Sequence, residues 1–272
     1  MKKNYLGLFT CMLVMAACQK EQSMHPIVAD QSQAVNSTSA TQITIPITAA
    51  SFPKELIDAK KGVIEFWAKL PGYSGSLSVG GADAHFFVLQ DGISDWFMGF
   101  NANDGAGNGG LIGSVGRVCR CGTGLYGGTW TYEKVFNGSK VQKWHHYKMV
   151  WRRNGIKGNE QQKVEIFVDG ALNSTRWANL YEKIIDPPTA GTINLITTDN
   201  PPSEPNDEII MDELKIYNSK NELVLWNSLD SQYEIEHSNV GPNGSFNGGG
   251  NAHFVSGKAG NALAAVPVYG GQ

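Results

Sequence analysis

Short runs of alternating apolar and polar residues, separated by glycine-rich turns, make up most of the chain. In Gly62–Leu70 one set of alternate positions is apolar: Ile64, Phe66, Ala68 and Leu70. The positions between them form a more polar set: Val63, Glu65, Trp67 and Lys69. A period of two predicts a β-strand with one face in a core and the other toward solvent.

Similar patterns predict further strands along the chain. They are Ile43–Ile47, His85–Gln90, Trp96–Asn101, Trp144–Arg152, Lys163–Val168, Ile193–Thr197, Ile209–Tyr217 and Leu223–Leu229. Turn pairs such as Asp91-Gly92 and Asp169-Gly170 separate some of them. The one helical segment we expect is Pro53–Lys61. Short strands with frequent turns predict an all-β fold, a two-sheet antiparallel sandwich.

The N-terminus differs from the rest of the chain. Two lysines, Lys2 and Lys3, precede an apolar run that ends Met15-Ala16-Ala17-Cys18. This is typical of a secretory signal, and the run is too short to cross a bilayer. Small residues before the cysteine resemble a lipobox, so we expect cleavage before Cys18 and its lipidation. An ordinary signal peptide with a chance cysteine is the alternative.

The remaining chain divides into two parts by composition. Residues 19–42 are rich in Gln, Ser, Thr and Ala and predict a flexible tether, and residues 43–272 predict one β domain. Lys20 and Glu21 resemble a signal that sends some Gram-negative lipoproteins to the cell surface. We therefore expect an outer-membrane lipoprotein, held to the membrane only by its lipid anchor. The net charge of −3, without a basic block, argues against nucleic acid as a partner.

Three runs together resemble the laminin-G-like, concanavalin A-like jelly roll. They are Gly62–Lys69, the pair Trp144–Tyr147 with Val164–Gly170, and Met211–Asn218. The segments Leu223–Asp230 and Gly257–Leu263 resemble strands that usually open this family, yet here they follow its closing strand. The resemblance thus implies a circularly permuted jelly roll in which 223–272 correspond to the opening strands. A truncated second repeat is the alternative.

Glycoside hydrolases share this fold, and they need two carboxylates flanking the scissile bond. The nearest run is Glu208–Glu213, where Ile210 interrupts the expected E-x-D-x-x-E pattern. His145 and His146 are adjacent on a strand and point to opposite faces, so they cannot act as a pair. We therefore predict no catalytic residues.

The family resemblance also implies a structural calcium ion. Many relatives hold one Ca²⁺ with the aspartate of the closing strand and backbone oxygens of the opening strand. Asp212 matches that aspartate, and Asp230 lies on the permuted partner strand. The alternative is that Asp212 only accepts hydrogen bonds from turn amides.

A glycine-rich stretch carries the candidate ligand surface. Tyr126, Trp130 and Tyr132 follow Cys119 and Cys121, and we expect Tyr126 to project from a Gly122–Gly128 loop. Aromatic faces bind sugar rings, although Trp130 and Tyr132 can equally belong to the core. The two cysteines fit a local disulfide, free thiols or, least well, a metal site.

These observations favour a noncatalytic binding module at the cell envelope. A glycan is the expected ligand, because aromatic residues among glycines suit sugar recognition and the fold family contains many lectins. A protein-binding adhesion or scaffold module, with an envelope or host protein as partner, is the second hypothesis. A glycoside hydrolase is the third.

Overall fold

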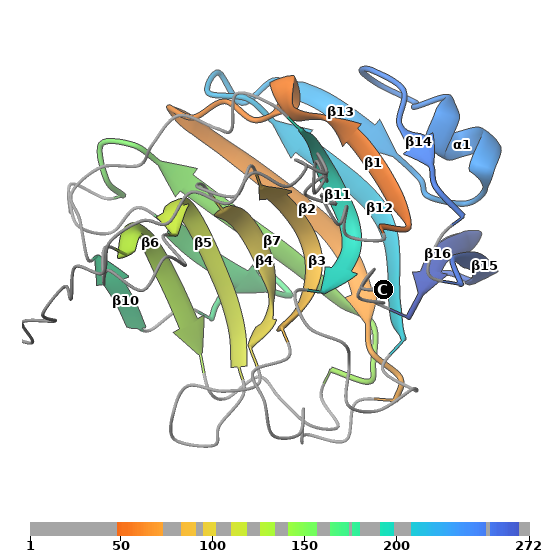
Figure 1. Ribbon diagram of the computed structural model, residues 1–272, viewed down its shortest axis with the longest axis horizontal. Helices are drawn as coiled ribbons and strands as arrows, with labels where there is room; N and C mark the ends of the chain where they lie inside the picture. Colours follow the sequence, from red (N-terminus) through yellow and green to blue (C-terminus); the bar gives the residue numbers. More distant parts are fainter. Residues whose placement is uncertain are drawn as a thin grey trace, which may run out of the picture. The chain divides into compact units, whose positions relative to one another are not determined.

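The computed structural model describes residues 48–72, 83–90, 95–101, 110–118, 126–133, 141–156, 164–173, 176–179, 191–198, 208–248 and 251–266. All of them lie within one compact unit, Ile43–Gln272. Among these residues, two antiparallel sheets face each other as layers (Figure 1). The all-β sandwich predicted from the hydrophobic pattern is confirmed.

Sheet A contains eight strands within the described ranges. In spatial order they are β10 (Arg176–Asn179), β6 (Tyr126–Glu133), β5 (Gly110–Val118), β4 (Asp95–Asn101), β3 (Asp83–Gln90), β11 (Thr192–Thr198), β1 (Ala50–Pro53) and β14 (Ser245–Phe246). The last pairing joins residues far apart in sequence, since Ala50 lies opposite Phe246. The late part of the chain therefore completes the edge of this sheet beside its earliest described strand.

Sheet B has the order β15 (His253–Ser256), β16 (Asn261–Ala265), β12 (Ile209–Tyr217), β2 (Lys61–Lys69), β7 (His145–Arg152), β8 (Val164–Val168) and β9 (Ala171–Leu172). A further strand, β13 (Leu223–Asn227), also pairs with β12. Along one edge of β12, Ile209–Met211 pair with β16 and Leu214–Tyr217 pair with β13. We expected the segment from Leu223 to join the same sandwich as Met211–Tyr217, and this pairing confirms it.

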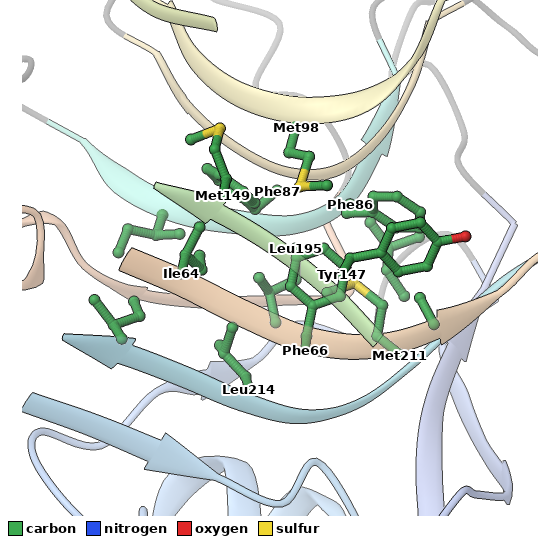
Figure 2. Close-up of a cluster of buried hydrophobic side chains, with 14 of the residues drawn as sticks. Ile64, Phe66, Phe86, Phe87, Met98, Tyr147, Met149, Leu195, Met211 and Leu214 are labelled. Atoms are coloured by element: carbon green, nitrogen blue, oxygen red, sulfur yellow. The ribbon is translucent and has the colours of Figure 1, made fainter. Parts of the chain in front are cut away.

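The core fills the space between the two sheets. Figure 2 shows part of it, with side chains from both layers meeting between the ribbons. Phe66, Phe86 and Tyr147 are fully buried, and their ring centroids lie 4.8 to 5.8 Å apart. Leu225 and Leu229 from the late segment are also fully buried, whereas Trp226 is half-buried. The residues after Asn218 thus contribute directly to the core.

The helical expectation was wrong. Pro53 ends β1, Lys54–Leu56 form a single 3-10 turn (η1), and Lys61 begins β2. A short helix that the pattern did not predict, α1 (Gln232–Glu236), begins after Ser231, whose hydroxyl accepts a hydrogen bond from the Glu234 amide. Within the described residues, no helix has the length and apolar character needed to cross a membrane.

Candidate functional site

The outer face of sheet B combines aromatic, basic and acidic side chains. Burial alternates along β2, with Ile64, Phe66 and Ala68 fully buried and the residues between them half-exposed. The register places Trp67 beside His146 and Glu65 beside Lys148 of β7. The more polar set recognised in the sequence therefore lies on this outer face, next to polar residues of its neighbours.

Three half-buried tryptophans mark this face, and each has a lysine ammonium above its ring. Lys69 lies 4.8 Å from the ring centroid of Trp144, Lys258 lies 4.7 Å from Trp67, and Lys215 lies 5.3 Å from Trp226. These distances are within the range of cation–π attraction. We call these six residues the tryptophan face. The three rings come from β2, β13 and the residue just before β7.

Polar contacts fix the side chains between these rings. Glu65 accepts a hydrogen bond from the Tyr217 hydroxyl at 3.1 Å, and its carboxylate lies 4.0 Å from Lys148. Glu213 lies 3.1 Å from Lys215 and accepts a hydrogen bond from the Trp226 indole at 3.0 Å. Such contacts hold polar groups and rings in defined positions before any ligand arrives.

His146 contributes little positive charge to this surface. Its ring lies 5.3 Å from the ring of Trp67, and its Nε2 is 3.8 Å from Glu65. Burial is the largest influence and lowers the pKa of His146, while the nearby Glu65 carboxylate opposes that change. At neutral pH the face therefore carries its positive charge on lysines.

Asp212 lies where β12 changes partner from β16 to β13. The pairing of β12 with β2 shifts register between Asp212 and Lys215, and Glu213 has a φ of +55°. This is a β-bulge, which turns a side chain away from its regular direction. Asp212 is fully buried beside this bulge, whereas Glu213, Lys215 and Tyr217 farther along β12 are partly exposed.

Asp212 and Asp230 together hold the turn between β15 and β16. Asp212 Oδ2 accepts hydrogen bonds from the amides of Lys258 and Ala259 at 2.6 and 3.0 Å, and Asp230 Oδ1 accepts one from Asn261 at 2.8 Å. Gly257 and Gly260 permit this approach, since a Cβ on either would lie 2.7 Å from a carboxylate oxygen. The hydrogen-bonding role considered for Asp212 is thus present in the structure.

The second oxygen of Asp212 bears on the calcium prediction. Oδ1 is buried without a hydrogen-bond partner, as is the hydroxyl of Ser228, whose carbonyl accepts a 3.3 Å bond from the Glu213 amide. Burial raises the pKa of Asp212 to about 6; the two turn amides oppose this, and Glu213 and Asp230 add to it. A buried carboxylate among other carboxylates favours a cation.

The side-chain donors for such a cation are few. Within the described ranges, no three His, Cys, Asp or Glu side chains gather in a way that could hold a metal ion. Calcium takes six to eight oxygens and accepts backbone carbonyls and water among them. A calcium ion at Asp212 Oδ1 would therefore need most of its other ligands from backbone carbonyls and water.

The predicted aromatic site lies on sheet A. Tyr126 is the first residue of β6 rather than part of a Gly122–Gly128 loop, and Trp130 and Tyr132 lie farther along the same strand. Their backbones pair with Val118, Ser114 and Ile112 of β5. Cys18, Cys119 and Cys121 lie outside the described residues. The three aromatics thus share one strand, and the expectation that Tyr126 lies in a loop was wrong.

The two adjacent histidines both contact Asp169, His145 through its ring and His146 through its backbone amide. His145 Nδ1 lies 2.6 Å from Asp169 Oδ2, and the other oxygen of Asp169 accepts the His146 amide at 3.0 Å. Asp169 has a φ of +50° in the turn between β8 and β9. These contacts lower the pKa of Asp169 against the opposing effect of burial. The arrangement joins a turn to the start of β7.

The interrupted carboxylate run does not form a catalytic pair in its described geometry. Glu208 lies 3.1 Å from His253 Nε2, Asp212 is buried against turn amides, and Glu213 binds Lys215 and Trp226. A retaining or inverting hydrolase needs two carboxyl groups on either side of an open substrate position. The three carboxylates of this run have separate partners instead.

The sequence pattern identified the outward-facing residues of β2 but did not indicate that they belong to a candidate binding surface. Trp67 and Lys69 alternate with core residues, and the same alternation occurs in any strand with one face toward solvent. Their lysine and tryptophan partners come from distant parts of the chain. No protein-family profile matches this sequence, and no curated protein matches it either.

Proposed function

We propose that this protein is a noncatalytic carbohydrate-binding module of the cell envelope, built on a laminin-G-like jelly roll whose opening strands follow its closing strand. The observation that carries the glycan proposal is the tryptophan face of sheet B. Half-buried indoles present flat apolar surface, while neighbouring carboxylates, ammonium groups and the Tyr217 hydroxyl offer hydrogen bonds. Sugar rings present the matching combination of C–H faces and hydroxyl edges.

The polar network supports this proposal because it is already formed without a ligand. Glu65, Tyr217 and Glu213 are held by contacts within the sheet, so a ligand would lose little affinity in ordering them. The lysines above the rings are long and flexible, and each can move to a sugar hydroxyl while keeping its charge in water. A sugar can then take the position over the ring.

Localisation and metal form the other parts of the proposal. Lipidation at Cys18 places the domain on the outer membrane, with residues 19–42 as its tether and the cell surface as one possible side. A calcium ion at Asp212 and Asp230 stabilises the β15–β16 turn, which carries Lys258 of the tryptophan face. The unpartnered Asp212 Oδ1 is the observation that supports the ion.

Replacing the face tryptophans tests the carbohydrate proposal. A glycan array with the full-length protein in detergent micelles identifies a bound oligosaccharide, and calorimetric titration then gives its affinity. Trp67→Ala and Trp144→Ala should each weaken binding about tenfold, the size expected for a tryptophan in a binding surface. Their melting temperatures should change little.

Two further variants give this test its contrast. Tyr233→Ala removes an aromatic residue of α1 that is 64% exposed and is not among the six residues of the tryptophan face, and it should leave affinity unchanged. Tyr126→Ala examines the aromatic strand β6 predicted from the sequence. Loss of binding in Tyr126→Ala alone would move the site to sheet A. A chain that binds no glycan but retains an envelope or host protein would favour the scaffold function.

A further inference from the structure

The lysines on the outer face of sheet B differ in how their charge is balanced. Lys148 lies 4.0 Å from Glu65, and Lys215 lies 3.1 Å from Glu213. Across the described residues, neither Lys69 nor Lys258 has a carboxylate within ion-pair distance, and each lies instead over a tryptophan ring. Lys148 and Lys215 are thus balanced by carboxylates of the sheet, whereas Lys69 and Lys258 have no such partner among the described residues.

These two lysines belong to one compact part of the surface. Lys69 and Trp67 are two residues apart on the same face of β2, which places their Cα atoms roughly 7 Å apart. Trp144, beneath Lys69, packs against the small apolar cluster of Ile210, Ala262 and Ala264. Lys258, above Trp67, is exposed. Two indole rings and two ammonium groups therefore form one patch.

The nearby carboxylate of Asp212 does not pair with the ammonium groups of these lysines. Asp212 lies opposite Trp67 in the β12–β2 register, yet it is fully buried and its Oδ2 accepts the amides of Lys258 and Ala259. Those bonds fix the backbone of the turn and leave the Lys258 ammonium pointing to the ring of Trp67. The carboxylate positions this lysine without neutralising it.

From this charge pattern we infer that the ligand is an acidic polysaccharide, bound where Lys69 and Lys258 flank Trp67 and Trp144. Carboxylate or sulfate groups of the chain pair with the two ammonium groups, and the sugar faces lie against the indoles. A neutral glycan would leave both charges unused, and a bare anion would leave both rings unused. This inference rests on the proposed carbohydrate function and names the ligand class.

Titration of the full-length protein in micelles with polygalacturonate, heparin and dextran tests the inference. Polygalacturonate supplies carboxylates, heparin supplies mainly sulfates, and dextran is neutral. Either acidic polymer should bind at least tenfold more tightly than dextran at low salt. Raising NaCl from about 0.05 to 0.5 M should weaken acidic binding strongly, because it shortens the Debye length severalfold. Dextran binding, if measurable, should not respond.

Lysine variants locate the contact. Lys69→Gln and Lys258→Gln should each weaken binding of the acidic polymer about tenfold, the effect of losing one charge-assisted contact. Lys258→Arg should restore most of it. Lys148→Gln removes the same charge from a lysine that lies outside the six residues of the tryptophan face and is balanced by Glu65, so it should change affinity less than threefold. Melting temperatures of all variants check that each is folded.

The outcomes separate this inference from the proposed function. Dextran bound as tightly as the acidic polymers, with loss in Trp67→Ala, would overturn the acidic ligand and keep carbohydrate binding. Acidic binding that Lys69→Gln and Lys258→Gln leave intact would overturn the assigned patch. Failure of every glycan on the array and of all three polymers would overturn both.

Discussion

Sheet B has two faces built from the same strands, and its tryptophans show how differently they are used. Trp151 of β7 points inward, where it is fully buried, donates its indole hydrogen to the Asp58 carbonyl at 2.7 Å and meets Trp96 edge-on at 5.5 Å. Trp67 of β2 points outward, half-buried between His146 and the ammonium of Lys258. One ring is part of the sandwich core and the other is accessible.

This contrast shows where the chain can vary its chemistry without losing its fold. Inner positions must fill a fixed volume at high density, so they admit few side chains. Outer positions of the same strands need only suit their neighbours, and here they hold lysines, carboxylates and indoles. A binding surface on the outer face therefore places few demands on the core beneath it.

Removing the segment after Asn218 should have the largest effect, because it supplies both faces. Leu225, Leu229, Ile235 and Leu263 are fully buried, and β13 and β16 cover one edge of β12. A chain ending at Asn218 exposes this core and that sheet edge and should show no cooperative thermal transition by circular dichroism. A sharp transition near that of the full chain would mean that the earlier residues fold alone.

Replacing one tryptophan on each face sharpens the comparison. Trp151→Ala should lower the free energy of unfolding by about 3–5 kcal/mol, since it opens a large cavity and leaves the Asp58 carbonyl without its donor. Trp67→Ala should cost about 1 kcal/mol or less, because a half-exposed ring leaves no closed cavity. Urea denaturation of both variants measures the difference. Equal losses would show that the outer ring is also part of the core.

Asp212 is a fully buried carboxyl group, so its ionisation should make the stability of the protein depend on pH. Its pKa rises from 3.8 to about 6 on folding, so the folded state holds this proton more tightly than the unfolded state. The stability linked to it is complete below about pH 4 and is lost as pH rises through 6. Ionisation of Asp212 should lower the free energy of unfolding by about 3 kcal/mol across this pH range. Urea denaturation from pH 4 to 7 measures it.

Two comparisons isolate that carboxyl group. Asp212→Asn should flatten the dependence between pH 4 and 6, whereas Asp230→Asn should leave most of it. Millimolar calcium should restore stability near pH 7 in the unaltered protein, and EDTA should remove the gain, because the ion binds only the folded state. An unchanged melting temperature with calcium and with EDTA would leave Asp212 as a hydrogen-bonding residue alone.

The hydrophobic pattern predicted the parts of the fold in which local and tertiary preferences agree. Buried and partly exposed positions alternate without interruption along β2. β13 is rich in apolar residues, as expected of a strand in the sandwich. β5 was not predicted, because three of its nine residues are glycine. Gly113 is explained by the opposite sheet, since a Cβ there would lie 2.9 Å from Met149 Sδ and 3.0 Å from Ile166 Cδ1. That contact is invisible in the local pattern.

The candidate site was predictable to a smaller extent. Asp212 and Asp230 were identified through the resemblance, and the structure brings them to the same turn. Lys258 and Trp67 are far apart in sequence, and no periodicity indicates that an ammonium group lies over that ring. The sequence distinguishes inner from outer positions on a strand. Which side chains meet across an outer face depends on the spatial order of the strands in the sheet, which the local pattern does not give.

The pairing of β14 with β1 and of β16 with β12 affects when the domain can fold during synthesis. β14 extends sheet A from β1, and β16 and β15 extend sheet B from β12; all three follow β12 in the chain. A nascent chain thus carries open sheet edges until its final stretch is available, and folding can complete only afterwards. The segments made after β12 are therefore the step that commits the domain to its native state.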